Sequence, residues 1–529
     1  MMSDVDQTAQ IRGSGNLIIQ AGRDVNLAAG PKLHLTRYET RRGRIESDAD
    51  RLTAYARAID MIGRDREMEA LSDWLGSASP IAVRVLTGPA GTGKTRLALE
   101  FVDEATEREW DAGFVTDREL ERFAAQENLA AWGWQDPTLI VVDYAAACAQ
   151  QLGVWLAELA DNDSVPPLRL LLLERHADPD SGWWREAFGR GTGEARAIQK
   201  LLDPAAPVPV PSLRDTEVRR SILAAILAEV GSDLRPPKRG VNPDFDGRLA
   251  RVSWGGEPLF LQMAGVLAAD IGFGHVLTLS RGELAFALAD REVARIERIA
   301  KANAMAPTFV VHMAAYATLC QGLTRGEALP AIAAEKTALM RASAGDPPEV
   351  FTVLASALPG EADSIAPVLP DMIGEAVLLR AGIDADAIIR AAATNRPRVA
   401  ATVMRTAQDY AQEELAPLDW LDRLVEAGGA DLAALIEIAD ALPKETLVLR
   451  TRAVELHAKI AEIARAMPDD GPTGQRRGIL AAALNNLANR LSEVGKREEA
   501  LDIAGEAVDL WRALAATRSC THKGDSFLR

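Results

Sequence analysis

The sequence contains only three cysteines among its 529 residues, Cys148, Cys320 and Cys520, and no two of them form a Cys-x-x-Cys pair. This spacing argues against a disulfide framework and a cysteine-based zinc site, and it fits a reducing compartment. The six histidines include no His-Glu-x-x-His arrangement, so nothing supports a hydrolytic metal site. We therefore expect a cytoplasmic protein.

Long runs of one chemical character are also missing. The formal net charge is -17 and there is no long basic run, which disfavours unaided binding to nucleic acid. No uncharged apolar run approaches the roughly 20 residues of a membrane span, and the first residues lack the basic-then-apolar order of a signal peptide. We expect no membrane attachment. The length suits three or four domains, and the wealth of alanine and leucine predicts much helix.

One stretch matches the phosphate-loop pattern G-x-x-x-x-G-K-[ST] at every fixed position. Its residues are Gly88, Pro89, Ala90, Gly91, Thr92, Gly93, Lys94 and Thr95. The apolar run 81–86 predicts a buried strand before it, and the run 95–101 predicts a helix after it. This context distinguishes a phosphate loop from a glycine-rich surface turn. Backbone N–H groups would surround the phosphates, Lys94 would reach the β- and γ-phosphates, and the Thr95 hydroxyl would hold Mg²⁺.

Two more apolar runs predict parallel strands beside the phosphate loop. Residues 139–142 lead into Asp143, and a carboxylate at that end of a buried strand can support the Mg²⁺ shell. Residues 168–173 lead into Glu174 and Arg175. Arg175 could sense the γ-phosphate, or it could be a salt-bridged arginine at a strand end, and the spacing leaves both open.

Composition and periodicity divide the chain into successive segments. They are a Gly-rich segment of short strands (1–35), a charged helical linker (36–60), an α/β P-loop domain with a parallel sheet (61–211), a mainly helical part (212–382), a further helical region (383–515) and a disordered tail (516–529). The proline-rich run 203–211 marks the end of the α/β domain, because proline removes ladder donors and breaks helices. The short strands of 1–35 could be a partly ordered arm or an assembly element.

Residues 481–511 match one tetratricopeptide unit. The matching positions are Leu484, Leu487, Ala488, Leu491, Gly495, Ala500 and Ala507. Small residues there let two antiparallel helices approach closely, and Gly495 suits the turn between them. A generic helical hairpin remains the alternative.

Five landmarks in order resemble the STAND class of P-loop ATPases, which are related to AAA+ proteins and include the NB-ARC and NACHT proteins. They are residues 63–67, the phosphate loop, 139–145, 170–175 with 182–184, and 256–259. The match is to the bacterial branch with C-terminal tetratricopeptide repeats. Residues 322–328 and 369–375 are similar to the winged-helix part of that branch.

The resemblance implies an α/β P-loop core followed by a helical lid (212–282), a winged-helix-like domain (283–382) and a tetratricopeptide-like region. It implies ATP or ADP with Mg²⁺, bound between core and lid. Lys94, Asp143 and Arg175 would be the catalytic residues: Lys94 would bind phosphate and Arg175 would act as sensor. Thr95 and Asp143 would hold the metal. The segment with Arg64 would close over the base, and Pro258 would approach the adenine.

In such proteins ADP holds a closed monomer, and a signal at the repeats permits exchange for ATP and assembly. Bacterial members commonly act in signalling or defence against phage. Here the four residues after Asp143 carry no acid to orient the attacking water, so we expect slow or no hydrolysis. The resemblance thus implies a switch with a protein ligand at its C-terminal helices and a homo-oligomeric active form.

Other functions remain open from the sequence. One is an AAA+-like ATPase that remodels a protein partner. Another is a non-enzymatic scaffold whose nucleotide is structural. A transcriptional regulator that uses a winged helix on DNA is disfavoured by the acidic balance.

Overall fold

The computed structural model describes residues 32–38, 45–126, 129, 132–160, 166–179, 182–189, 193–340, 345–360, 363–443, 446–468 and 475–524. The short strands expected within residues 1–31 lie outside this set.

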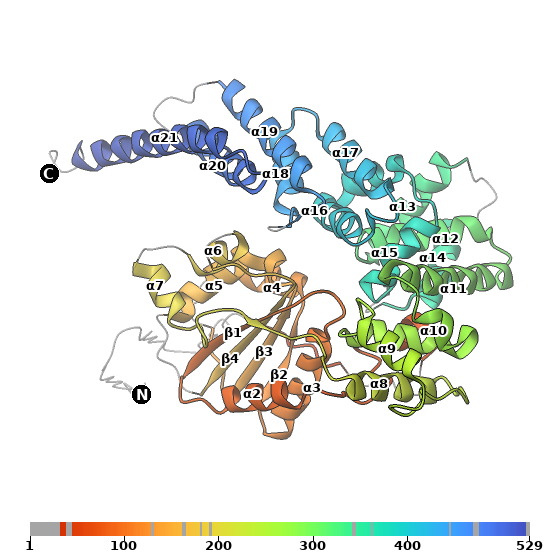
Figure 1. The fold of residues 1–529 in the computed structure, drawn as a ribbon. Coiled ribbons are helices and arrows are strands. Elements are labelled where there is room, and N and C mark those ends of the chain that lie inside the picture. Colours follow the sequence, from red (N-terminus) through yellow and green to blue (C-terminus); the bar gives the residue numbers. More distant parts are fainter. Residues whose placement is uncertain are drawn as a thin grey trace, which may run out of the picture.

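A five-stranded parallel sheet forms the centre of the α/β domain (Figure 1). Its strands are β1 (Ile81–Thr87), β2 (Asp111–Val115), β3 (Thr138–Asp143), β4 (Leu168–Glu174) and β5 (Val208–Pro209), in the spatial order β2-β3-β4-β1-β5. The long apolar runs correctly predict β1, β3 and β4. The sequence does not reveal β2, whose short run includes alanine and glycine. The proline-rich run does more than end the domain, because it adds β5 at the sheet edge, where proline is tolerated.

Helices cover both faces of the sheet (Figure 1). On one face lie α2 (Asp65–Leu75) and α3 (Lys94–Glu107); on the other lie α4 (Asp117–Ala124), α5 (Ala149–Ala160), α6 (Gly182–Phe188) and α7 (Gly193–Gln199). Side chains alternate between the faces, as the pleat requires. In β4, Leu171 and Leu173 pack with α2 and α3, whereas Leu170 and Leu172 pack with α5 and α6. The result is a three-layer α/β core.

The segment before the α/β domain docks on the sheet edge instead of forming a continuous helix. Thr36 pairs with Phe114 of β2 through two backbone hydrogen bonds of 2.7 and 2.8 Å. Farther along, only α1 (Asp48–Arg51) is helical in the described part of the expected linker. Asp48 pairs with Arg291 of a distant helix at 2.9 Å. The charges that suggested a long helix therefore serve tertiary contacts here.

The rest of the described chain is helical apart from one small antiparallel strand pair. First come α8 (Thr216–Glu229), α9 (Pro243–Arg251) and α10 (Pro258–Val276). Next come α11 (Arg281–Ala302), α12 (Pro307–Leu319), β6 (Leu323–Thr324), α13 (Arg325–Ala338), α14 (Pro347–Ala357), β7 (Ser364–Ile365) and α15 (Asp371–Arg380). The last are α16 (Ala385–Tyr410), α17 (Ala416–Gly428), α18 (Leu432–Asp440), α19 (Arg450–Ala466), α20 (Gln475–Glu493) and α21 (Arg497–Gly524). A continuous apolar core joins them.

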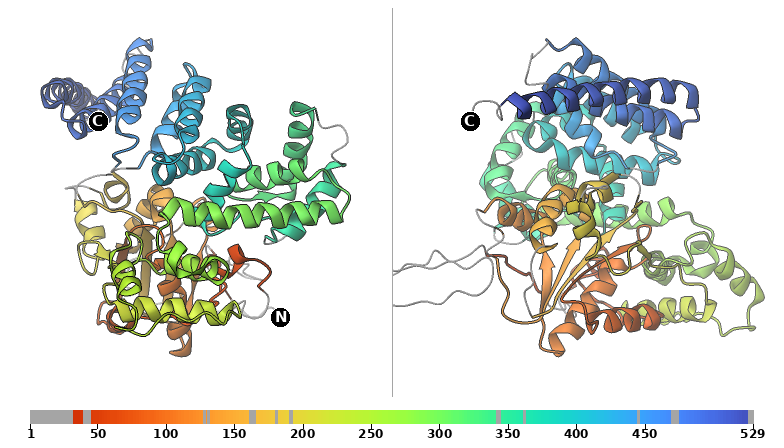
Figure 2. Two further views of the ribbon diagram at one scale, coloured as in Figure 1. Left: turned by 45° about the vertical axis from the view of Figure 1, so that its right-hand side comes forward. Right: turned by 90° about the vertical axis from the view of Figure 1, so that its left-hand side faces the viewer.

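The last helices form an elongated arm (Figures 1 and 2). The hairpin of α20 and α21 stands at the end of this arm, with Gly495 in the left-handed region (φ 82°) at its turn. Helix α21 continues to Gly524, eight residues past the expected start of the disordered tail at 516. The alanine-rich sequence around that point favours helix, which accounts for the difference.

Within the part of the chain that the structure describes, α10 is the one helix long and apolar enough to cross a membrane, with a mean hydropathy of 1.4. It packs against α8, and eight of its residues belong to the shared apolar core. This burial accounts for its apolar composition. We place α10 in the core of the helical region.

Gly265 sets the spacing of α10 and α8. A Cβ at this position would lie 2.1 Å from Cγ2 of Ile226. We expect Gly265→Ala to lower the free energy of unfolding by about 1–3 kcal/mol, because a packed interface resists an added methyl group. Thermal unfolding of the two proteins measures this. Gly274→Ala in the same helix is the control, since nothing lies within 4 Å of that Cβ; equal melting temperatures for both variants would contradict the packing argument.

Candidate functional site

The glycine-rich loop connects β1 to α3 at the carboxyl edge of the sheet. Gly91 and Gly93 have φ of 83° and 92°, a region that side chains rarely adopt. Gly93 directly precedes α3, whose first turn has no side-chain cap. The N–H groups of that turn are therefore available to an anionic ligand, and the helix dipole favours negative charge there. The strand, loop and helix together form an α/β P-loop core.

Lys94 begins α3 and turns back over the loop. Its Nζ donates to the carbonyl oxygen of Gly88 at 2.5 Å and to that of Pro89 at 3.3 Å. Burial lowers the pKa of Lys94 to about 8, and the negative charge of Asp143 opposes this shift. The ammonium thus lies inside the curve of the phosphate loop, and its contact with the β- and γ-phosphates remains a prediction.

The structure brings Thr95 and Asp143 into contact. The Thr95 hydroxyl donates to Oδ2 of Asp143 at 2.8 Å, and the backbone N–H of Tyr144 donates to Oδ1 at 3.0 Å. Burial raises the pKa of Asp143 to about 6, against the opposing effects of the Thr95 hydrogen bond and the Lys94 charge.

The Thr95–Asp143 pair suits Mg²⁺. Both side chains offer oxygen, which this cation prefers, and Mg²⁺ in phosphate sites commonly takes only one or two protein ligands. Bound there, the cation would neutralise charge on the phosphate oxygens. The chemistry of the donors therefore fits the predicted metal, which would take its remaining ligands from phosphate and water.

The start of α10 lies directly against the phosphate loop. The Leu259 N–H donates to the carbonyl oxygen of Gly91 at 3.2 Å, and a Cβ on Gly91 would lie 3.1 Å from the ring of Phe260. Pro258 Cγ is 3.8 Å from the position of a Gly93 Cβ. The structure thus brings Pro258 to the loop, as expected for a lid over the site.

Arg64 contacts the backbone of the phosphate loop. Its buried guanidinium donates to the carbonyl oxygens of Thr92 at 2.8 Å and Pro211 at 2.7 Å, and it pairs with Glu67 at 3.3 Å. The side chain ties the phosphate loop to the connection that leads into α8. Its role in this structure is to position the loop, and the expectation that its segment closes over the base remains a prediction.

Glu257, the residue before α10, is buried beside Arg281, and its Oε2 has no hydrogen-bond partner in the structure. Burial raises the pKa of Glu257 to about 7, with Arg281 opposing the shift. Because the folded pKa lies above the ordinary value, this group stabilises the fold at low pH and loses that contribution as pH rises through about 7.

We therefore expect Glu257→Gln to gain stability relative to the wild type between about pH 5 and 8, since an amide does not ionise. Melting temperatures of the two proteins across this range measure the difference. Glu229→Gln, an exposed position on α8, is the control. A difference that stays constant with pH would contradict the assignment.

A charge cluster connects the sheet edge to α15 and α16. We call it the interdomain charge cluster, and its members are Tyr144, Arg175, Asp371, Glu375, Arg405 and Asp409. Arg175 Nη1 lies 3.1 Å from Oδ2 of Asp409, and Nη2 lies 3.9 Å from Oδ2 of Asp371. The Tyr144 hydroxyl also donates to Asp371.

The charges of this cluster are strongly coupled. Burial lowers the pKa of Arg175, but Asp409, Glu375 and Asp371 outweigh it and raise the pKa overall. Burial and the nearby Asp409 raise the pKa of Glu375 well above its ordinary value, and Arg175 and Arg405 oppose this shift. These contacts dock α15 and α16 at the sheet edge, and we call this docking the closed arrangement.

The sequence therefore predicts the phosphate loop and the Thr95–Asp143 pair, but of the interdomain charge cluster it predicts only Arg175. For Arg175, the structure contains the salt-bridged arginine that the spacing left as one of two alternatives. Asp371 and Glu375 lie in the 369–375 landmark, yet no local pattern predicts where they point. Asp409 is 234 residues from Arg175, and no sequence signal connects the two.

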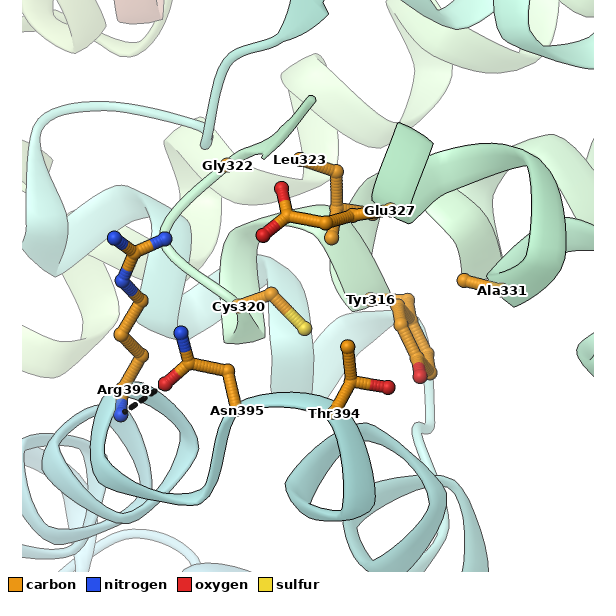
Figure 3. Close-up of a pocket in the computed structure, with 9 residues that line it drawn as sticks. All are labelled: Tyr316, Cys320, Gly322, Leu323, Glu327, Ala331, Thr394, Asn395 and Arg398. Carbon is orange, nitrogen blue, oxygen red and sulfur yellow. Dashed lines mark hydrogen bonds between the residues drawn. The ribbon is translucent and has the colours of Figure 1, made fainter. Parts of the chain in front are cut away.

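A small pocket lies away from the phosphate loop, between α12, β6, α13 and α16 (Figure 3). One wall is the kink of α16 at Asn395, whose Oδ1 accepts from the Arg398 N–H at 3.2 Å. Cys320 faces this pocket, and burial raises its pKa to about 12. Its thiol therefore remains protonated at neutral pH and is a weak nucleophile.

Comparisons with known proteins are distant. No protein-family model matches the sequence, and no curated protein matches it. A solved DNA replication initiation factor is similar at 15% identity over 48% of this chain and 74% of its own, with a TM-score of 0.27. NtrX from Brucella abortus in complex with ADP is similar at 16% identity over 47% of this chain and 66% of its own, with a TM-score of 0.27. At such TM-scores neither similarity supports an inference, so the function must be argued from the residues of the site.

Proposed function

We propose that this chain binds ATP and ADP at the phosphate loop and acts as a nucleotide-gated switch of the STAND type. The triphosphate tail would lie along the first turn of α3, between Lys94 and the Thr95–Asp143 pair. The lid would cover the loop from the start of α10. This arrangement supplies the positive charge, N–H donors and metal ligands that a triphosphate needs.

The observation that carries the switch is the pairing of Arg175 with Asp409 and Asp371. Arg175 stands at the carboxyl end of β4, next to the strand that leads into the phosphate loop. From this edge its side chain would reach a γ-phosphate, but here Asp371 of α15 and Asp409 of α16 hold its guanidinium. A triphosphate and these two carboxylates would compete for one arginine.

Electrostatics makes this competition a conformational signal. If Arg175 turns to a γ-phosphate, Asp371 keeps Arg405 at 3.9 Å, but Asp409 loses the arginine with which it pairs at 3.1 Å. Leaving a fully buried charge unpaired costs roughly 3–5 kcal/mol, and Asp409, whose side chain is 20% exposed, would lose less than this. ADP lacks the γ-phosphate and places no such demand on the arginine. ATP would therefore favour separation of α15 and α16 from the sheet, and ADP would favour the closed arrangement.

The region after the lid supports this proposal. Helix α12, strand β6, helices α13 and α14, and strand β7 follow one another, and Pro359 bridges to Ile365 of β7. We propose that these elements form the winged-helix-like domain expected here. The cluster residues of α15 lie directly after it.

The C-terminal arm supports a protein-binding role. Leu501 and Val508 lie about two turns apart on α21, and Trp511 lies about one turn beyond Val508. These side chains are 74, 44 and 49% exposed, in that order. Large apolar side chains on one helix face suit a protein ligand better than a small polar one. We propose that such a ligand biases the arm, and that the ATP-bound form assembles into a homo-oligomer in the cytoplasm.

Native mass spectrometry with ADP and with a slowly hydrolysed ATP analogue tests the proposal. We expect one ADP on a monomer and a larger assembly with the ATP analogue. Well-folded protein that retains neither nucleotide would overturn the nucleotide site itself. Retention of both without any change in mass or shape would favour a scaffold with a structural nucleotide.

A further inference from the structure

Glu174 occupies the centre of the site, although the sequence pattern gives it no role. It is the last residue of β4, the strand between β1 and β3. In the register of the sheet, Glu174 stands beside Thr87, and its neighbour Leu173 stands beside Asp143. Glu174 therefore lies at the carboxyl edge between the strand of the phosphate loop and the strand of Asp143.

The carboxylate of Glu174 is fixed by backbone amides. Its Oε1 accepts from the N–H of Arg175 at 2.6 Å, and its Oε2 accepts from the N–H of Ala146 at 3.0 Å. A carboxylate oxygen has two acceptor positions, so each oxygen retains one. Neutral amides therefore hold the carboxylate in place at the end of β4.

Glu174 and Asp143 point to opposite faces of the sheet. Glu174 continues the series of Leu170 and Leu172, which face α5 and α6, whereas Asp143 points to α3 and Thr95. An acid directly after Asp143 would project on the same side as Glu174. That position is Tyr144, which adopts φ of 54° and directs its hydroxyl to Asp371. Glu174 is the carboxylate that the structure supplies on this side of the site.

We infer that Glu174 orients the attacking water in a slow hydrolysis of ATP; this rests on the proposed nucleotide site. The water oxygen forms a bond to the γ-phosphorus while the bond from that phosphorus to the β,γ-bridging oxygen breaks. The bridging oxygen keeps the electron pair and leaves with ADP. The water protons pass to the phosphate product and to solvent. Glu174 accepts a hydrogen bond from the water and holds its lone pair toward the phosphorus.

This assignment revises the expectation drawn from residues 144–147. The missing acid after Asp143 does not leave the site without a carboxylate, because β4 supplies one from the neighbouring strand. Turnover remains slow while Arg175 is bound to Asp409, since the arginine is then turned from the transferring group. Hydrolysis would follow opening of the interdomain charge cluster and return the chain to its ADP form.

Glu174→Gln in the full chain tests the inference. We expect its affinity for ATP to stay within about threefold of wild type, while single-turnover hydrolysis falls by roughly 100-fold or more. After prolonged incubation with ATP, native mass spectrometry should find ATP on the variant and ADP on the wild type. Glu186→Gln, an exposed position on α6, is the matched control and should behave as wild type.

The outcomes are distinct. A variant that binds ATP and hydrolyses it at the wild-type rate overturns the inference, and so does a wild type that binds ATP and never hydrolyses it. If Glu174→Gln does not fold, Glu174→Asp provides the test. This variant keeps the negative charge but has a side chain shorter by one methylene group. Hydrolysis at the wild-type rate in Glu174→Asp would then overturn the inference. Failure of the wild type to bind ATP instead overturns the proposed function on which it rests.

Discussion

Lys94→Ala is expected to weaken the binding of both ATP and ADP by about 30-fold or more. The Lys94 ammonium lies within the phosphate loop, 2.5 Å from the carbonyl oxygen of Gly88. A triphosphate would receive this ammonium as a buried, charge-assisted donor. Removing one partner from such a pair costs roughly 2–5 kcal/mol, and each 1.4 kcal/mol is a tenfold change in affinity.

Isothermal titration calorimetry measures this loss. Lys238→Ala is the control, because Lys238 is exposed in the connection between α8 and α9. The melting temperature of the nucleotide-free variant should change little, since the hydrogen bonds of the Lys94 ammonium go to carbonyl oxygens of its own loop. Equal affinities in Lys94→Ala and wild type would show that the loop does not hold phosphate.

Asp371→Asn is expected to raise the affinity for ATP by about 5- to 150-fold while changing the affinity for ADP much less. The amide can still accept the hydrogen bond from Tyr144, but it no longer attracts Arg175. The closed arrangement loses an ion pair, and ATP no longer has to compete with it for the arginine. Because ADP does not require the arginine, its binding gains little.

Calorimetry with ADP and with a slowly hydrolysed ATP analogue gives the two affinities, and native mass spectrometry shows whether assembly now needs less nucleotide. Asp363→Asn makes the same charge change at an exposed carboxylate that contacts Arg325 at 3.4 Å. If Asp371→Asn changes the two affinities by the same factor, the cluster is not specific for the γ-phosphate. If neither affinity changes, Arg175 and Asp371 form an ordinary surface pair.

The sequence predicts those parts of the fold that depend on local pattern. The apolar runs that become β1, β3 and β4 are buried on both faces, so each reads as a continuous hydrophobic stretch. Strand β2 escapes prediction because Ala112 and Gly113 carry little apolar surface. Gly113 is required there, since a Cβ would lie 2.9 Å from Leu35 and Thr36 of the docked segment. That need arises from a tertiary contact which no local pattern contains.

The site divides in the same way. Lys94 and Thr95 follow from a loop motif, and Asp143 follows from the end of a buried strand. The partners of Arg175 depend on how α15 and α16 fold back on the sheet, which periodicity does not reveal. Glu174 directly precedes Arg175 in the sequence, but no sequence pattern gives it a role. Its position between the phosphate-loop strand and the strand of Asp143 follows only from the register of β4 with β1 and β3.

Helix α16 has a mechanical consequence. It departs from helical geometry at Asn395, with Pro397 two residues later, and its two halves serve different parts of the molecule. The first half is anchored through Arg390 to the buried Glu335 of α13, while the second carries Asp409 and has α17 packed along it. A ligand that displaces the arm would move the second half of α16 by bending the helix at Asn395. Asp409 would move with that half, so ligand binding at the arm would change the contact of Asp409 with Arg175 at the end of β4.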